Sequence, residues 1–330
     1  MKSSAVAFSD VGLVEIVSVD VPIPAPGEVQ VRTRMSYISP GTEGWVLRNQ
    51  FSWMPTSFPC IPGYQRVGTI EAVGAGVVGF ELGQRVVATT SQGYASIAAQ
   101  WGAHAALGNT VETEVFAVPD TVDDVNASAA VVAQVGYNAA ARLFLDRGDW
   151  VVVYGDGIIG QCAAQAARAR GARVLLVGHR SERLAIAKKY SADITVNNKE
   201  RNLTDAVEGL IGKNATMAVI DTVQTRSART EYSSLLQRST GQIVYAGFNA
   251  DDRWDEMGEL QKKEFTTHFI SGWTRNRIEK TIALMEGGSI DVGKLTTHIV
   301  RFDRAAEMYS MIELKNSHFL GVALKWGDVE

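Results

Sequence analysis

The sequence predicts an α/β protein in which a doubly wound parallel sheet accompanies a separate β-rich domain. The unbroken apolar run Val151–Tyr154 is typical of a strand that is buried on both faces. It leads through a glycine-rich turn into an alanine-rich helix that ends near Gly171, and a second apolar strand follows over residues 173–177. With 330 residues, the chain also exceeds the size at which a single hydrophobic core usually divides.

The turn after the first strand has the G-x-G-x-x-G pattern and reads Gly155-Asp156-Gly157-Ile158-Ile159-Gly160. In this pattern Gly155 permits a tight turn, Gly157 lets a pyrophosphate approach the backbone, and Gly160 lets the helix pack on the strand. Ile158 and Ile159 open the helix, whose N-terminus offers free N–H groups and a positive dipole end to phosphates. This context predicts a dinucleotide cofactor on a Rossmann-type sheet; the structural alternative is a turn that binds nothing.

The end of the second strand distinguishes between the nicotinamide cofactors. Proteins that bind NAD usually carry an acid there, which accepts a hydrogen bond from the ribose 2′-hydroxyl. This chain instead reads Gly178-His179-Arg180, which offers no carboxylate and a guanidinium suited to a 2′-phosphate. NADP(H) is therefore favoured over NAD(H), although a shifted loop would bring Glu182 to the ribose. Gly247, at the end of a later strand, is also expected beside the cofactor.

Composition and charge argue against several other classes of protein. The net charge is −4 and no basic block occurs, so no nucleic-acid partner is expected. No signal peptide or apolar run of 18 residues is present, so a cytoplasmic protein without a membrane partner is expected. The two cysteines, Cys60 and Cys162, are expected to be buried thiols rather than a disulfide.

The order of patterns along the chain predicts its domains. Residues 1–123 contain short alternating apolar runs, for example over residues 4–8 and 29–36, separated by prolines and glycines. Such spacing predicts a compact, barrel-like domain. Helices and strands alternate from residue 124, so residues 124–272 are assigned to the dinucleotide-binding domain. Residues 273–330 are expected to return and complete the first domain.

Local motifs along nearly the whole chain are shared with one large group of proteins. They are Pro26-Gly27-Glu28-Val29, Pro62-Gly63-Tyr64-Gln65-Arg66-Val67-Gly68, Gly83-Gln84-Arg85-Val86, Gly136-Tyr137-Asn138-Ala139 and Leu295-Thr296-Thr297-His298. On these motifs the chain resembles the medium-chain dehydrogenase/reductase superfamily. Its segment Ser39-Pro40-Gly41-Thr42-Glu43 is similar to the branch that includes bacteriochlorophyllide hydroxyethyl dehydrogenase. The resemblance implies a GroES-like catalytic domain, a small-molecule substrate and a homodimer.

The chain departs from the zinc-dependent members of that superfamily at each metal ligand. It has Pro40 and Tyr64 where those enzymes carry a cysteine and a histidine, and Val131 where they carry a third ligand. These residues do not supply the nitrogen, sulfur and carboxylate ligands that a catalytic zinc requires, so no metal is expected. The alternative is a site assembled from other side chains, namely Glu43, His104 and His298.

Without zinc, a side chain must stabilise the negative charge that develops on the substrate oxygen. The resemblance places Tyr64 at the substrate cleft, where a phenol both donates a hydrogen bond and supplies a proton. Thr42 matches the hydroxyl of the family's proton relay, and His104 is a candidate general acid or base. Gln65 is expected to bond Tyr64 or the substrate. A purely structural role is the alternative for each of these residues.

Aromatic side chains between residues 45 and 58 predict a substrate face, with Trp45 and Trp53 as its candidates. The alternative is a loop packed on its own domain or on a partner subunit, and Trp254 is a further candidate for either role. The sequence thus predicts a zinc-independent oxidoreductase that transfers hydride between NADP(H) and an alcohol or carbonyl substrate. The alternatives are an enone or quinone reductase and a dinucleotide-binding protein without catalysis.

Overall fold

In a computed structural model, the chain forms two compact units that are each built from more than one segment. The first unit comprises Met1–Val131, Ile278–Glu286 and Thr296–Glu330, and the second comprises Val132–Arg277 and Gly287–Leu295. The structure describes residues 1–247, 257–314 and 318–327. No helix within those ranges is long and apolar enough to cross a membrane.

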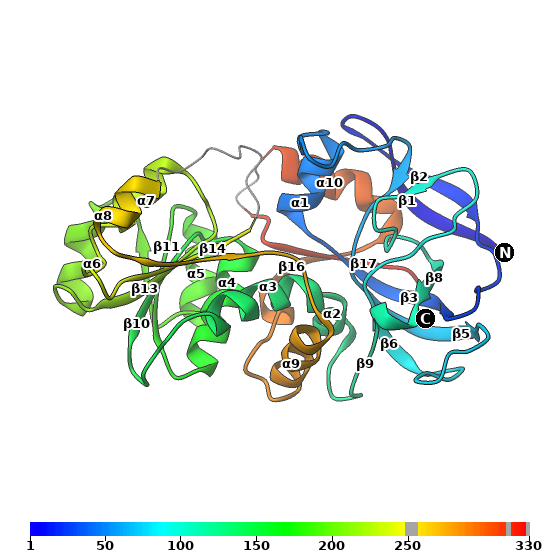
Figure 1. Cartoon of the computed structure of the whole chain (residues 1–330). Helices are drawn as coiled ribbons and strands as arrows, with labels where there is room; N and C mark the ends of the chain where they lie inside the picture. The colour runs from blue at the N-terminus through cyan, green and yellow to red at the C-terminus, as the bar shows by residue number, and fades with distance from the viewer. Residues whose placement is uncertain (248–256, 315–317, 328–330) are drawn as a thin grey trace. The chain divides into compact units, whose positions relative to one another are not determined.

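The second unit is organised around a six-stranded sheet in which all neighbouring strands are parallel (Figure 1). The strand order is β12-β11-β10-β13-β14-β15, so the chain starts in the middle, winds to one edge and then to the other. This is the order of a doubly wound dinucleotide-binding sheet, whose ligands bind at the carboxyl ends of its central strands. The strands are β10 (Trp150–Tyr154), β11 (Arg173–Gly178), β12 (Ile194–Asn197), β13 (Thr216–Asp221), β14 (Gln242–Ala246) and β15 (Thr266–Ile270).

The helices of this unit pack closely because the residues at their contacts are small. A Cβ at Gly136 in α3 would lie 2.7 Å from Cys162 Cβ in α4, so only glycine lets the two helices approach this far. Both cysteines of the chain are buried free thiols, as the sequence predicted. The helices are α3 (Ala130–Ala141), α4 (Ile158–Ala169), α5 (Ser181–Tyr190), α6 (Leu203–Ile211), α7 (Arg226–Tyr232) and α8 (Met257–Lys262), and a 3₁₀ turn covers Gly293–Leu295.

The first unit contains two sheets, and the C-terminal segment of the chain joins the larger one. The smaller sheet has the order β2-β1-β4-β7; the larger has the order β16-β17-β3-β5-β6-β9, with β8 also paired to β3. β17 pairs antiparallel with β3, so the last strand of the chain is part of a sheet built by the first 120 residues. The sequence-based prediction of a β-rich first domain and a doubly wound parallel sheet is confirmed.

The strands of the first unit are β1 (Lys2–Asp10), β2 (Leu13–Asp20), β3 (Glu28–Ile38), β4 (Cys60–Ile61), β5 (Arg66–Val73), β6 (Arg85–Ala88), β7 (Ala98–Ala99), β8 (Leu107–Val111), β9 (Val115–Ala117), β16 (Thr296–Arg301) and β17 (Gly321–Lys325). Its helices are α1 (Pro40–Leu47), α2 (Asp124–Ser128), α9 (Arg275–Glu286) and α10 (Ala305–Glu313), with 3₁₀ turns at Glu112–Glu114 and Phe302–Arg304. α1 and α10 contribute to one apolar cluster with strands β1, β3 and β17. This cluster surrounds the polar side chains described below.

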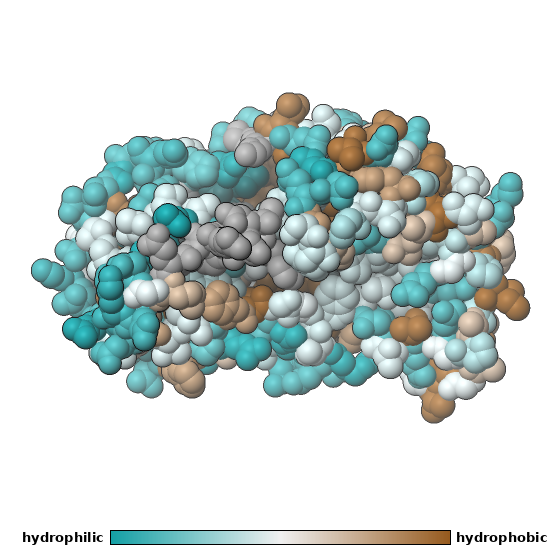
Figure 2. All heavy atoms as spheres, turned by 45° about the horizontal axis from the view of Figure 1, so that its top comes forward, coloured by the Kyte–Doolittle hydropathy of each residue, from teal (hydrophilic) through white to brown (hydrophobic). Residues whose placement is uncertain are grey.

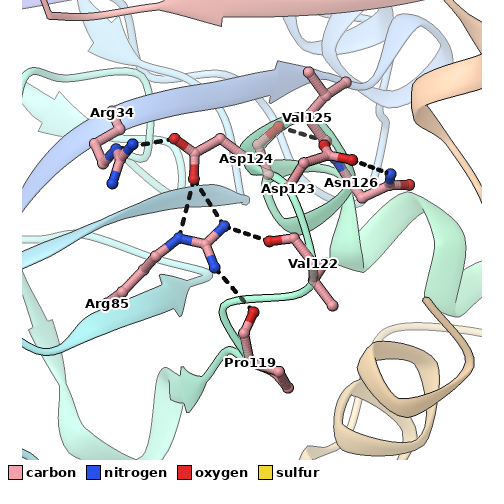
Figure 3. Close-up of polar contacts among 9 residues, drawn as sticks. Arg34, Arg85, Pro119, Val122, Asp123, Asp124, Val125 and Asn126 are labelled. Carbon is pink, nitrogen blue, oxygen red and sulfur yellow. Dashed lines mark hydrogen bonds and ion pairs between the residues drawn. The ribbon is translucent and has the colours of Figure 1, made fainter. Parts of the chain in front are cut away.

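Asp124 fastens the segment that leads out of the first unit to two strands of the larger sheet (Figure 3). Its Oδ1 accepts from Arg85 Nε and Nη2 at 3.0 and 2.7 Å, and its Oδ2 lies 2.9 Å from Arg34 Nε. Arg85 also donates to the carbonyl oxygens of Pro119 and Val122. Because Asp124 lies in the first turn of α2, its charge also complements the helix dipole. One acid and two guanidiniums therefore fix the path of the chain ahead of α3.

The surfaces of the two units differ on the face drawn in Figure 2. Hydrophilic residues dominate over the second unit, whereas hydrophobic residues are more frequent over the first. In the second unit, Phe144 and Phe269 are exposed large apolar side chains, and Phe269 belongs to β15, the last strand of the sheet. Exposed large apolar side chains of the first unit include Val11, Leu13, Ile23, Trp53, Val78 and Leu82.

Candidate active site

The glycine turn joins β10 to α4 at the carboxyl edge of the parallel sheet. Gly155 has a φ of +122°, and a Cβ there would lie 2.1 Å from Thr222 Oγ1. A Cβ at Gly160 would lie 2.1 Å from the carbonyl oxygen of Gly155. Among the residues that the structure describes, nothing lies within 4 Å of a Cβ built at Gly157, which caps α4 without a side-chain hydrogen bond. The turn therefore leaves the N–H groups at the start of α4, around Ile158 and Ile159, available to a phosphate.

Asp156, inside the glycine turn, places a carboxylate at the end of β11. Its Oδ2 accepts from the backbone N–H groups of His179 and Arg180, both at 2.9 Å. Its Oδ1 lies 3.4 Å from Arg180 Nη1 and 3.7 Å from Arg183 Nη1. The position of Asp156 also requires a glycine at residue 178, because a Cβ there would lie 2.4 Å from Asp156 Cβ. An acid is therefore present at the strand end, but it comes from the turn and faces two guanidiniums.

The end of β11 is a strongly cationic environment. Burial and the neighbouring Arg180 lower the pKa of Arg183 to about 10, and Arg183 Nε is buried without a hydrogen-bond partner among the described residues. Burial lowers the pKa of His179, and the positive charges of Arg180, Lys199 and Arg183 act in the same direction. Asp156 offsets only part of this charge. The end of β11 therefore carries three cationic or basic side chains around one carboxylate.

The loop after β13 completes the polar surroundings of the glycine turn, and the sequence analysis did not identify it. Asp221 is fully buried and accepts from the backbone N–H groups of Val223 and Gln224 at 2.8 and 2.9 Å, and from the Tyr232 hydroxyl at 2.8 Å. Gln224 Nε2 donates in turn to the carbonyl of Gly247 at 3.3 Å. The aspartate therefore holds two strand ends together at the edge where the turn lies. In the sequence, Asp221 is marked by its position as an acidic residue directly after a run of apolar strand residues.

In the first unit, Glu43 is the centre of a fully buried polar network. The carboxylate belongs to the first turn of α1, and its Oε1 accepts from the backbone N–H of Ser39 at 2.8 Å. Its Oε2 lies 2.9 Å from His104 Nε2 and also accepts from the Tyr309 hydroxyl. Three hydrogen-bonding groups thus converge on one buried carboxyl group, as a polar group in an apolar setting requires. Tyr309 reaches Glu43 from α10, 266 residues further along the chain, so no local sequence signal points to it.

His104 connects Glu43 to the C-terminal strand segment. Its Nδ1 lies 2.8 Å from Ser36 Oγ, which also accepts from Trp326 Nε1 at 2.8 Å. The Trp326 indole N–H can only donate, so Ser36 Oγ accepts from it and directs its own proton at His104 Nδ1. This assigns the proton of a neutral His104 to Nε2, which then donates to Glu43. A Cβ at Gly63 would lie 2.6 Å from the imidazole ring, so this glycine makes room for His104. His104 is fully buried within this network.

Tyr64 lies beside the network and is 7% exposed. Burial, assisted by the negative charge of Glu43, raises its pKa above the usual tyrosine value, and hydrogen bonds from Ser39 and Thr42 oppose this shift. Its ring packs edge to face against Trp101, with 5.2 Å between the ring centroids. The structure therefore brings Tyr64, Thr42 and Glu43 together. The phenol stays protonated at neutral pH and is fit to donate a hydrogen bond.

The Gln65 side chain is bonded to backbone groups of its own unit and is not exposed to solvent. It is fully buried, with Nε2 donating to the Tyr37 carbonyl at 3.2 Å and Oε1 accepting from the Val131 N–H at 3.0 Å. These bonds attach the end of β3 to the start of α3. No group of three or more histidine, cysteine or carboxylate side chains in the described ranges lies close enough together to hold a metal ion. The set of Glu43, His104 and His298 is therefore not such a group.

The aromatic side chains of α1 and the segment after it pack against one another and against the apolar cluster of the first unit. Phe51 is buried, and its ring lies 5.2 Å from Trp45 and 5.0 Å from Trp53, measured between centroids. Trp45 is half-buried, whereas Trp53 is 58% exposed. Trp53 is thus the residue of this segment that offers an open apolar face. Trp254 lies outside the described residues.

A GroES-like domain joined to a doubly wound parallel sheet defines a class of nicotinamide-dependent dehydrogenases, and comparison with known sequences agrees with this class. Residues 25–122 match the family model of the alcohol dehydrogenase GroES-like domain, and residues 159–287 match that of zinc-binding dehydrogenases. An alcohol dehydrogenase of Moraxella sp. is 30% identical over 258 residues, which cover 72% of this chain and 75% of that protein. An alcohol dehydrogenase of Cupriavidus necator is 25% identical, with coverage of 97% and 98%. The chain belongs to the alcohol dehydrogenase family of the medium-chain dehydrogenase/reductase superfamily.

Solved structures share the fold over the full length of the chain. An Escherichia coli oxidoreductase of unknown specificity superposes with a TM-score of 0.88 at 21% identity and covers 99% of this chain and 100% of its own. An alcohol dehydrogenase from E. coli CFT073 in complex with NADH has a TM-score of 0.84 at 23% identity, with coverage of 98% and 99%. A zinc-binding dehydrogenase from Sinorhizobium meliloti 1021 bound to NADP has a TM-score of 0.84 at 19% identity and the same coverage. At these identities the likeness establishes the fold alone.

Proposed function

We propose that the protein is a zinc-independent oxidoreductase that prefers NADP(H) and interconverts a small alcohol and its carbonyl compound. The observation that carries the proposal is the position of Tyr64. A buried, protonated phenol lies next to Thr42 and the buried Glu43, and the sequence resemblance matches it to a metal ligand of zinc-dependent members of the superfamily. A hydrogen-bond donor aimed at a substrate oxygen can stabilise negative charge there in place of a metal ion.

The residues of the second unit fit a dinucleotide cofactor. The glycine turn and the start of α4 would receive its pyrophosphate, and the loops that end at Gln224 and Gly247 would border its other half. When bound, the nicotinamide supplies or accepts the hydride. The preference for NADP(H) is supported by Arg180, Arg183 and Lys199, whose combined charge exceeds that of Asp156.

The donors of the first unit do not fit the zinc site of the family. Pro40 has no ligand atom in its side chain, and Val131 is apolar and buried. Tyr64 and the fully buried Glu43 and His104 remain, and the last two are already bonded to each other. A catalytic zinc needs three such ligands and an open fourth position. No step of the reaction is therefore assigned to a metal.

Tyr64 would act as the proton donor to the carbonyl oxygen during reduction. Its raised pKa keeps the phenol protonated, so it can stabilise the developing alkoxide and then pass on its proton. Thr42 would relay a replacement proton to Tyr64 through the hydroxyl contact between them. At neutral pH the phenol is therefore present in the protonated form that carbonyl reduction requires. Trp53 would provide an apolar face for the substrate.

Steady-state kinetics of Tyr64→Phe tests this assignment. We expect kcat for carbonyl reduction by NADPH to fall by about 10²–10⁴-fold, the usual contribution of a positioned acid, while the KM for NADPH is unchanged. Tyr190→Phe, on α5 of the second unit, is the matched control and should retain full activity. The proposal would be refuted if activity rose and fell with the zinc content of the protein, or if Tyr64→Phe lowered kcat by less than about threefold.

The same phenol would also stabilise an enolate, so reduction of an enone or quinone is the second candidate function. Product analysis after NADPH oxidation separates the two, since reduction at a carbonyl yields an alcohol and reduction at a conjugated double bond yields a ketone. A protein that binds NADPH but oxidises it with no carbonyl, enone or quinone substrate would instead be a non-catalytic binder.

The homodimer implied by the resemblance is also part of this proposal. β15 is the last strand of the parallel sheet and carries the exposed Phe269, which offers an edge and an apolar contact to a second copy. Light scattering coupled to gel filtration measures the oligomeric mass, and Phe269→Lys should lower it. The cytoplasmic location stays a prediction.

A further inference from the structure

A groove of about 550 Å³ opens in the second unit, at the edge of the sheet opposite the glycine turn. Three of its lining residues, Arg147, Ala172 and Asp193, precede β10, β11 and β12, whereas the glycine turn follows β10. Because the strands are parallel, the groove lies at their amino ends and the cofactor turn at their carboxyl ends. The groove is therefore a separate site, and the reaction proposed above gives it no role.

A buried amide holds the walls of the groove together. Gln165 in α4 donates through Nε2 to the carbonyls of Tyr190 and Asp291, at 3.4 and 3.3 Å, and its Oε1 accepts from the Asp291 N–H at 2.9 Å. One side chain thus joins α4, the end of α5 and the loop over residues 288–294. Small residues, Ala169, Gly171 and Ala172, line the groove between these walls. The groove is consequently preformed and does not depend on a ligand for its shape.

The lining carries more positive than negative charge, and its acids are already engaged. Asp193 Oδ2 accepts from the Val174 N–H at 2.7 Å, and its Oδ1 lies 3.6 Å from Arg168 Nε. Asp291 Oδ2 lies 2.7 Å from Lys294 Nζ. The remaining cations of the lining are Arg147 and Lys189. Neither has an acidic partner within residues 1–247, 257–314 and 318–327.

These two cations are not needed to cap the helices that end here. The carbonyl of Ala167 near the end of α4 accepts from the N–H groups of Arg170 and Ala172. The carbonyl of Ala187 in α5 accepts in the same way from residues 191 and 192, and Gln165 serves the Tyr190 carbonyl. Backbone and amide donors thus satisfy the carbonyls of Ala167, Ala187 and Tyr190 without a bond from Arg147 or Lys189. Positive charge is left over for another anion.

We infer that this groove binds a compact phosphate monoester. A guanidinium and an ammonium in the lining of one groove suit a tetrahedral dianion, because Arg147 can bind two of its oxygens and Lys189 a third. The Tyr190 ring holds Lys189 Nζ at 4.9 Å and Lys294 Nζ at 6.0 Å from its centroid, which favours ammonium groups at this side of the groove. The volume leaves room for a small polar body beyond the phosphate.

Isothermal titration calorimetry of the full-length protein with glycerol 3-phosphate, at constant ionic strength, tests this site. The titration is carried out with and without saturating NADP⁺, since phosphate at the cofactor site would be displaced by the nucleotide. The test variant is Arg147→Gln combined with Lys189→Gln. The control combines Lys188→Gln with Lys280→Gln, which removes the same charge from two exposed lysines outside the groove. Amide shifts of Gly171, Gly288 and Ser289 report binding at the groove itself.

We expect glycerol 3-phosphate to bind equally with and without NADP⁺, to bind at least ~10-fold more tightly than chloride, and to lose about tenfold or more in affinity only in the test variant. Equal losses in test and control variants, competition by NADP⁺, or no preference for the monoester over chloride would each overturn the inference. If the protein binds no nicotinamide cofactor, the proposed function fails, but the comparison of the groove variants is unaffected.

Discussion

Replacing Glu43 with glutamine is the most informative perturbation of the first unit. The change preserves shape but removes the charge on which Ser39 N–H, His104 Nε2 and the Tyr309 hydroxyl converge. The one carbonyl oxygen of glutamine can face either Ser39 or the other two donors, so at least one charge-assisted hydrogen bond is lost. Such bonds contribute about 1.5–3 kcal/mol each, and breaking a buried pair costs about 3–5 kcal/mol. We therefore expect Glu43→Gln to lower the free energy of unfolding by about 3 kcal/mol.

Urea unfolding followed by tryptophan fluorescence measures this loss. The matched control is Glu71→Gln, because Glu71 pairs with Arg32 on the surface of the same unit and exposed pairs contribute at most about 1 kcal/mol. Glu43→Gln should also lower the pKa of Tyr64, because the Glu43 charge is one of the causes that raise this pKa. In the pH–rate profile for carbonyl reduction, the activity of Glu43→Gln should accordingly decline at a lower pH than that of the wild type. A loss of stability below about 1 kcal/mol would show that Glu43 is not the centre of the network.

Three further changes test other parts of the structure. Arg180→Ala should weaken NADPH by about 10–100-fold and NADH by less than about threefold in binding titrations, and equal losses would exclude contact with a 2′-phosphate. Gly178→Ala should lower the free energy of unfolding by about 1–3 kcal/mol in calorimetry, because its Cβ would overlap Asp156; a neutral result would contradict this packing. Burial raises the pKa of Tyr64 and Tyr309, so the folded state keeps protons that the unfolded state loses above about pH 10. Stability in urea should therefore fall above about pH 10 by up to about 1.4 kcal/mol per pH unit for each group, and Tyr309→Phe should reduce this slope.

The parallel sheet and its turn were predictable because their signals are local. An apolar run, three glycines and an alanine-rich helix occupy neighbouring positions, and each has one physical reason to be there. Asp156 lies inside the same motif, but the pattern itself gives this position no role. The sequence showed no acid at the end of β11, since the acid arrives there from the adjacent strand's turn. Gly178 is part of the same arrangement, because a Cβ at this position would overlap Asp156.

The polar network of the first unit was only partly predictable. The resemblance pointed to Tyr64, Thr42 and His104, but the two partners of His104, Ser36 and Glu43, lie more than 60 residues before it, and Trp326, which bonds to Ser36, lies near the end of the chain. Long-range pairs such as Glu43 with Tyr309 leave no periodic or spaced signal in one sequence. The glycine before Tyr64 did carry a signal, since its Cβ would overlap the His104 ring. A glycine next to a candidate catalytic residue therefore indicates that another group packs closely against the backbone at the glycine.

The burial of Glu43 has a consequence for the protonation state of Tyr64. A carboxylate in an apolar surrounding favours the protonated form of any acid beside it, because a second negative charge would be repelled and poorly solvated. Tyr64 is that neighbour, and its pKa is raised by both effects. A zinc ion would act in the opposite sense, since it lowers the pKa of the groups bound to it. In the proposed mechanism the protonated phenol therefore gives its proton to the carbonyl oxygen during reduction, a role for which its raised pKa keeps it in the correct protonation state at neutral pH.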